Sequence, residues 1–89
     1  MDIIDVHCHY GAWNFPIPGC GTVENLLRLC DRYGIRFALT SSAEAIVFDM
    51  RRGNEALARA LGRDERLLGY VYCDPRDLPG SCAEMDAYL

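Results

Sequence analysis

Residues 22–40 read TVENLLRLCDRYGIRFALT, and this stretch decides the fold. Its first part predicts a helix from the N-cap Thr22 to the stop at Gly34, because apolar side chains recur at helical spacing. These side chains are Val23, Leu26, Leu27, Cys30 and Tyr33. Directly after the glycine, Ile35–Thr40 is rich in apolar residues and predicts a strand. A helix followed at once by a strand indicates an α/β chain.

On the N-terminal side, Ile3–Val6 is a short β-branched run that predicts a first strand ending at His7. The segment from Tyr10 to Gly21 then carries a density of turn formers that no strand or helix interior tolerates. These turn formers are Gly11, Pro16, Pro18, Gly19 and Gly21. A long connection therefore joins the first strand to the helix.

On the C-terminal side, residues 43–53 show no clear period. A second helix is predicted over Asn54–Leu61, with Gly62 as its stop and a start that lies up to several residues earlier. Leu67–Tyr72 predicts a third strand. Ser81–Glu84 has the S-x-x-E form of a capping box, which predicts that a third helix begins there.

This order of elements demands a mainly parallel sheet with right-handed crossovers. An open doubly wound sheet and an eight-stranded barrel both satisfy it. Three βα units of a (β/α)8 TIM barrel correspond to roughly 94 residues, close to the 89 of this chain, whose last helix shows no stop signal. We therefore expect residues 1–89 to be the N-terminal part of an incomplete TIM barrel, with strand one beside strand two alone and a free outer edge on strand three. Because these edges are free, the chain is expected to be marginally stable or self-associated.

The composition excludes several classes of protein. The formal net charge is −4 and the pI is near 4.9, which argues against nucleic acid as a partner. The longest apolar run is far too short to span a membrane, and no signal peptide is visible, so a cytoplasmic location is expected. Five cysteines without a C-x-x-C pair fit neither a disulfide framework nor a zinc ribbon, and are expected to be reduced and mostly buried.

His7 and His9 are the residues that carry chemistry. They are the only histidines of the chain, and they stand two apart where the first strand meets its loop. Residues i and i+2 of a strand project to the same side, so both imidazoles can reach one ion. Imidazole nitrogen suits zinc, iron, nickel or copper. We expect a divalent metal ion there, with zinc as the first choice.

Other polar residues near this pair have less specific roles. Asp5 is expected on the strand face of His7, either as an acceptor for an imidazole N–H or as an acid satisfied by a neighbouring strand. Cys8 faces the opposite side, where core packing is favoured over metal ligation. Three aromatic residues of the first loop either line a substrate pocket or anchor the loop, and these are Tyr10, Trp13 and Phe15. The residues that end the other strands favour turn or cap roles over substrate contact, and these are Ser41, Ser42 and Asp74.

Ile4–Gly11, which reads IDVHCHYG, resembles the opening H-x-H-x-G of the amidohydrolase superfamily, specifically its amidohydrolase-related branch of metal-dependent TIM-barrel hydrolases and decarboxylases. Leu26–Thr40 is similar to the helix, turn and second strand of that branch. Asn54–Leu57, Arg66–Tyr70 and the pair Asp74–Pro75 are similar to its second helix and third strand. The resemblance covers nearly the whole chain, but only H-x-H is mechanistically specific.

The resemblance implies hydrolysis of a C–N or C–O bond in a small-molecule substrate, with His7 and His9 as the first two metal ligands. The later histidine and aspartate ligands of the family have no counterpart, so no catalytic residue is assigned and the 89-residue chain is expected to be inactive alone. A decarboxylase of the same family, or a phosphoesterase or nuclease barrel that also opens with H-x-H, remains an alternative. Two further alternatives are a non-enzymatic small α/β binding domain and a structural zinc module. Assembly into a homo-oligomer is also left open.

Overall fold

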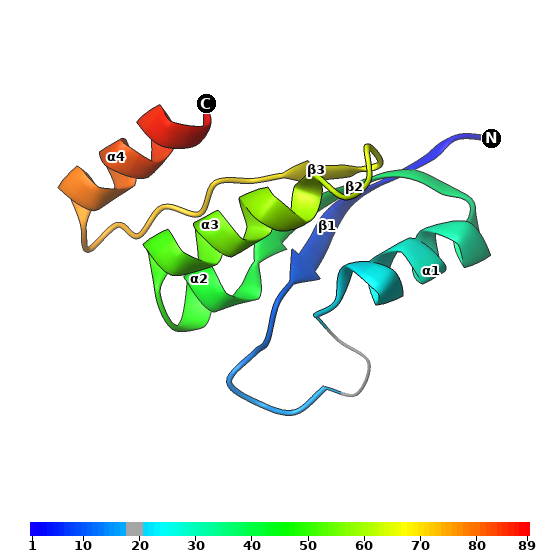
Figure 1. Ribbon diagram of the computed structural model, residues 1–89, viewed down its shortest axis with the longest axis horizontal. Helices are drawn as coiled ribbons and strands as arrows, with labels where there is room; N and C mark the ends of the chain where they lie inside the picture. The colour runs from blue at the N-terminus through cyan, green and yellow to red at the C-terminus, as the bar shows by residue number, and fades with distance from the viewer. Residues whose placement is uncertain (18–20) are drawn as a thin grey trace.

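The computed structural model describes residues 1–17 and 21–89, so the turn formers Pro18 and Gly19, together with Cys20, lie outside the described residues. The elements are, in chain order, β1 (Ile3–Tyr10), α1 (Val23–Tyr33), β2 (Ile35–Ser42), α2 (Ala43–Val47), α3 (Met50–Leu61), β3 (Leu67–Gly69) and α4 (Leu78–Tyr88). The strands form one parallel sheet in the order β1-β2-β3 (Figure 1). The predicted α/β class, strand order and parallel pairing are confirmed.

Helix α1 begins and ends as its sequence predicts. The Thr22 hydroxyl accepts a hydrogen bond from the backbone N–H of Asn25 at 3.1 Å, which satisfies one of the free N–H groups of the first turn. Gly34 closes the helix at a φ of 68°, in the left-handed region that favours glycine. The chain then enters β2 without a further loop residue.

One face of the sheet carries the core. Its buried members are Val23, Cys30, Ala38, Ala60 and Leu67, which come from α1, β2, α3 and β3. Both α1 and α3 therefore pack on the same face of the sheet, while α4 lies at the opposite end of the molecule from α1 (Figure 1).

The second face of the sheet is apolar and open. Ile4 and Val6 of β1, Leu68 of β3 and Tyr70 just after it are 45–61% exposed. Phe37 of β2 alternates with buried Ala38 and is only half-buried. Among the described residues, no helix is long and apolar enough to cross a membrane.

All three strands differ from their predicted lengths, and β2 continues past Thr40 to Ser42. β1 continues past His7 to Tyr10, whereas β3 ends at Gly69 instead of Tyr72. The backbone of Tyr72 is bound by the buried Asn54 of α3, whose amide donates to the Tyr72 carbonyl at 2.9 Å and accepts the Tyr72 N–H at 3.1 Å. A side-chain amide thus takes the backbone groups that would otherwise continue the strand ladder.

Residues 43–53, which show no clear period, form α2 and the first turn of α3. The Ser42 hydroxyl caps α2 by accepting the Ala45 N–H at 3.0 Å, and the Asp49 carboxylate caps α3 by accepting the Arg52 N–H at 2.8 Å. The second predicted helix therefore starts at Met50, four residues before Asn54.

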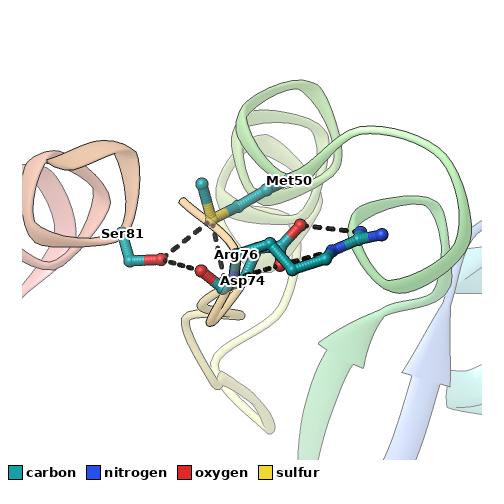
Figure 2. A network of polar contacts seen from close by, with 4 residues as sticks. All are labelled: Met50, Asp74, Arg76 and Ser81. Carbon is teal, nitrogen blue, oxygen red and sulfur yellow. Dashed lines mark hydrogen bonds and ion pairs between the residues drawn. The ribbon is translucent and has the colours of Figure 1, made fainter. Parts of the chain in front are cut away.

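The predicted capping box at Ser81–Glu84 is wrong. α4 begins at Leu78, because the Asp77 carboxylate accepts the backbone N–H of Gly80 at 2.9 Å and caps the helix one turn earlier. The Ser81 hydroxyl instead donates to the Asp74 carbonyl at 2.9 Å and lies 3.6 Å from the Met50 sulfur (Figure 2). Figure 2 shows the contact between Ser81 and Met50 joining α4 to the start of α3.

Gly53 in α3 offers a direct test of how α3 packs against the end of β2. A methyl group at this buried position would overlap the Ala45 backbone and lie 2.6 Å from the Ser42 hydroxyl. We expect Gly53→Ala to lower the free energy of unfolding by about 1–3 kcal/mol, although alanine is the better helix former. Urea denaturation followed by circular dichroism measures this change.

The matched control is Gly62→Ala at the end of the same helix. Its added methyl group would meet nothing closer than the Arg59 carbonyl at 3.5 Å, and its φ of −65° suits alanine. We expect this variant to be as stable as the original chain or slightly more stable. Equal stability of Gly53→Ala and Gly62→Ala would contradict the packing described here.

Candidate metal centre

The His7 and His9 side chains meet in the C-terminal half of β1. Their rings lie on the same side of the strand, with centroids 4.9 Å apart and planes at 67°. The two Nε2 atoms are 3.1 Å from each other. The two rings lie on one side of the strand, as expected, but β1 continues to Tyr10, so His7 lies within the strand and not at its end.

This spacing fits a shared metal ion. Two nitrogen ligands at ~2.0 to 2.1 Å from a tetrahedral zinc ion lie about 3.3 Å apart, close to the separation of the two Nε2 atoms. Within residues 1–17 and 21–89, no cluster of three or more His, Cys, Asp or Glu side chains is placed to hold a metal. A zinc ion held by this pair would have two of the three ligands that a catalytic zinc ion usually takes from protein.

Ser41 holds the outer nitrogen of His9. It stands opposite His9 in the parallel register of β1 and β2, and its Oγ lies 2.9 Å from His9 Nδ1. When Nδ1 donates its proton to this hydroxyl, Nε2 keeps a free lone pair for a cation. The sequence left Ser41 as a turn or cap residue, and the missing signal was the register that pairs the ends of the two strands.

The surroundings of His9 favour its neutral form. Burial lowers the pKa of His9 below its ordinary value, and the charge of His7 lowers it further. The indole of Trp13 packs against the His9 ring edge-on, with centroids 4.9 Å apart. A neutral imidazole at pH 7 is the state that binds a metal ion, because protonation removes the lone pair.

A β-bulge moves Asp5 away from the histidine rings. Between Asp5 and Cys8 the pairing with β2 advances by three residues on β1 and by two on β2, so the two faces no longer alternate. Asp5 pairs with the buried Ala38, and its carboxylate accepts the backbone N–H of His7 at 3.0 Å. The expectation that Asp5 shares the face of His7 is therefore wrong.

Cys8 lies on the helix-packed side, as expected for a core residue. It is half-buried against the hydrophobic core. Burial raises the pKa of the Cys8 thiol to about 12, helped by a hydrogen bond with Asp5 and by the charge of that carboxylate. A thiol in this state is a poor metal ligand and a poor nucleophile at neutral pH.

The three aromatic residues expected in the first loop separate into two groups, because Tyr10 is the last residue of β1. Tyr10 packs against the core. Trp13 lies beside His9, and Phe15 stacks on Trp13 with centroids 5.8 Å apart and planes at 21°. Phe15 is 54% exposed, so this pair forms an apolar surface next to the histidines.

Two further strand-end residues take structural roles, as the sequence favoured. Ser42 caps α2. Asp74 accepts the backbone N–H of Arg76 at 2.9 Å and pairs with its guanidinium, and these hydrogen bonds lower the pKa of the Asp74 carboxyl (Figure 2). Both groups are therefore committed to local turns.

Comparison of the chain with protein-family models, with curated proteins and with solved structures gave no match.

Cys8 and the exposed Cys82 allow a test of this placement. At pH 8 we expect iodoacetamide to alkylate Cys8 about 100-fold or more slowly than Cys82, because a raised pKa leaves little of the reactive thiolate. Mass spectrometry of peptides from timed samples of the folded protein measures both rates. Similar rates for the two thiols would show that Cys8 does not face the core.

Proposed function

We propose that this chain forms the metal-binding part of a metal-dependent hydrolase of the amidohydrolase type, acting on C–N or C–O bonds of small-molecule substrates. The observation that carries the proposal is the 3.1 Å separation of His7 Nε2 and His9 Nε2 on one side of β1. Two imidazoles whose Nε2 atoms converge on a partly exposed strand, with His9 Nδ1 held by Ser41, match metal ligation better than packing.

The architecture proposed with this function is the first part of a (β/α)8 barrel. Its support is that α1 and α3 pack on one face of the sheet, as in a singly wound barrel, whereas a doubly wound sheet carries helices on both faces. The open face, with Ile4, Val6 and Leu68, has the apolar character of a barrel interior. The histidine pair then lies toward the carboxyl ends of the strands, where barrel enzymes build their sites.

The proposed division of roles follows from the contacts. A divalent ion held here would act as a Lewis acid and lower the pKa of water. His7 and His9 would hold it through Nε2, Ser41 would keep the His9 ring in its ligating tautomer, and Trp13 would restrict water on the outer side of His9. No general base is assigned among these residues.

Metal binding by the two histidines is the central test. We expect the purified chain to bind one Zn²⁺ or Co²⁺ per molecule weakly, and His7→Ala or His9→Ala to reduce the affinity by at least about 100-fold, since each removes half of the protein ligands. Titration calorimetry measures the affinity. Trp13, the only tryptophan of the chain, adds a fluorescence signal from beside His9.

Cys8→Ala is the matched control, because it lies between the two histidines in sequence but faces the core. It should lower stability while leaving metal affinity nearly unchanged. In a chain that carries the complete barrel, His7→Ala and His9→Ala should also abolish turnover on a panel of amide, ester and lactone substrates. Retention of metal and activity after loss of both histidines would refute the proposed function.

Ser41→Ala tests the second contact of His9. Loss of the hydroxyl frees His9 Nδ1, so we expect metal affinity to fall by about 10-fold with little change in the unfolding midpoint. Ser42→Ala is the control, because the Ser42 hydroxyl caps α2 and should affect stability alone. The proposed role of Ser41 would not survive a result in which both variants bind metal as the original chain does.

A further inference from the structure

The peptide group between Val6 and His7 lies in the β-bulge of β1. In the register, Val6 and His7 together stand opposite the single residue Leu39 of β2. A bulge of this kind interrupts the regular ladder and leaves backbone groups in need of other partners. This peptide group directly precedes the Cα of His7, so its orientation sets the direction in which the His7 ring points.

Two side chains bind the two polar groups of this peptide. The His7 N–H donates to Asp5 Oδ1 at 3.0 Å. The Val6 carbonyl accepts a hydrogen bond from the phenol of Tyr70 at 3.1 Å. The bulge peptide is therefore held from both ends, once by a residue of β1 and once by a residue 64 positions away in the chain.

Tyr70 is itself firmly attached to the sheet. Its backbone N–H donates to the Thr40 carbonyl at 2.9 Å, directly after the last paired residue of β3. Its phenol then reaches Val6 of β1, so the side chain extends across β2 on the open face of the sheet. Tyr70 is 45% exposed, which means that burial alone does not fix the position of its side chain.

We propose that Tyr70, together with Asp5, is a positioning residue for the metal-binding pair. By holding the Val6–His7 peptide, the two side chains keep the His7 ring directed toward His9, with the Nε2 atoms close enough to share one ion. This inference rests on the proposed function for its ligand, but not for its geometry. The segment directly after β3 thus belongs to the site through Tyr70, although it supplies no metal ligand.

The test uses the full chain and four variants. Tyr70→Phe removes only the phenol oxygen, Asp5→Ala removes the carboxylate, and Asp5→Asn keeps an oxygen that accepts the His7 N–H. Tyr33→Phe is the matched control, because Tyr33 is exposed at the end of α1 and contacts Arg32. Three readouts are compared, namely Co²⁺ affinity, the visible spectrum of bound Co²⁺, and the nuclear Overhauser effect between the His7 and His9 ring protons without metal.

We expect Tyr70→Phe and Asp5→Ala each to weaken Co²⁺ binding by about 3- to 10-fold and to change the Co²⁺ spectrum, since a freed bulge lets the His7 ring turn away. The Overhauser effect between the rings should weaken in both variants. Asp5→Asn should stay close to the original chain. The double variant Tyr70→Phe/Asp5→Ala should lose less than the product of the two single effects, because both side chains hold one peptide group.

The outcomes separate this inference from the proposed function. Unchanged Co²⁺ affinity, spectrum and ring contact in Tyr70→Phe and Asp5→Ala would overturn the positioning role while leaving the metal centre intact. A loss that Tyr33→Phe shares would overturn it as well. If no form binds Co²⁺ but Tyr70→Phe still weakens the ring contact, the positioning role stands and the metal-binding proposal fails.

Discussion

The extra residue of β1 opposite Leu39 governs the site, because it decides which side chains face the core and which face outward. In a regular strand, residues 5, 7 and 9 would share one face. With the bulge, Asp5 and Cys8 both lie on the helix-packed side, and His9 pairs on the open side with Ser41. The bulge thus removes the Asp5 carboxylate from the neighbourhood of the two imidazole nitrogens, while Cys8 keeps the core-facing side that it would have in a regular strand.

Side chains complete the backbone hydrogen bonds at several points where the regular elements stop. Asn54 binds the Tyr72 backbone where β3 ends, Tyr70 and Asp5 bind the bulge peptide, and Asp77 caps α4. In each case a polar side chain supplies a partner that the ladder or the helix cannot. The backbone after the short β3 therefore still has hydrogen-bond partners, although the strand ladder ends at Gly69.

Most of the fold could be predicted from the sequence, because its strongest signals are local. Helix α1 is determined locally, by its cap Thr22, its apolar period and its stop at Gly34. The parallel pairing of the strands follows from the alternation of strands and helices along the chain. The start of α4 was missed because two capping signals compete within five residues, and the Ser81 hydroxyl is taken by the Asp74 carbonyl. A local sequence pattern does not show which of two capping side chains is already bound to another part of the chain.

The candidate site, like the fold, could be predicted from the sequence only in part. The His7 and His9 pair could be predicted, since a spacing of two residues fixes a shared side even when a bulge precedes it. The sequence could not predict the contacts of Asp5, Ser41 and Tyr70. These contacts depend on the register of β1 against β2 and on a side chain that crosses the sheet. Register is a long-range property that a single strand sequence does not encode.

The proposed metal site and the proposed barrel depend on each other. Next to His9, the neighbouring strand presents the hydroxyl of Ser41, which is a partner for an imidazole rather than a third zinc ligand. On the other side of β2, Tyr70 uses its phenol to hold β1 and brings no ligand either. Further ligands would therefore have to come from strands other than β2 and β3. Closure of a sheet into a barrel is the arrangement that brings the carboxyl ends of distant strands to one point above the apolar interior.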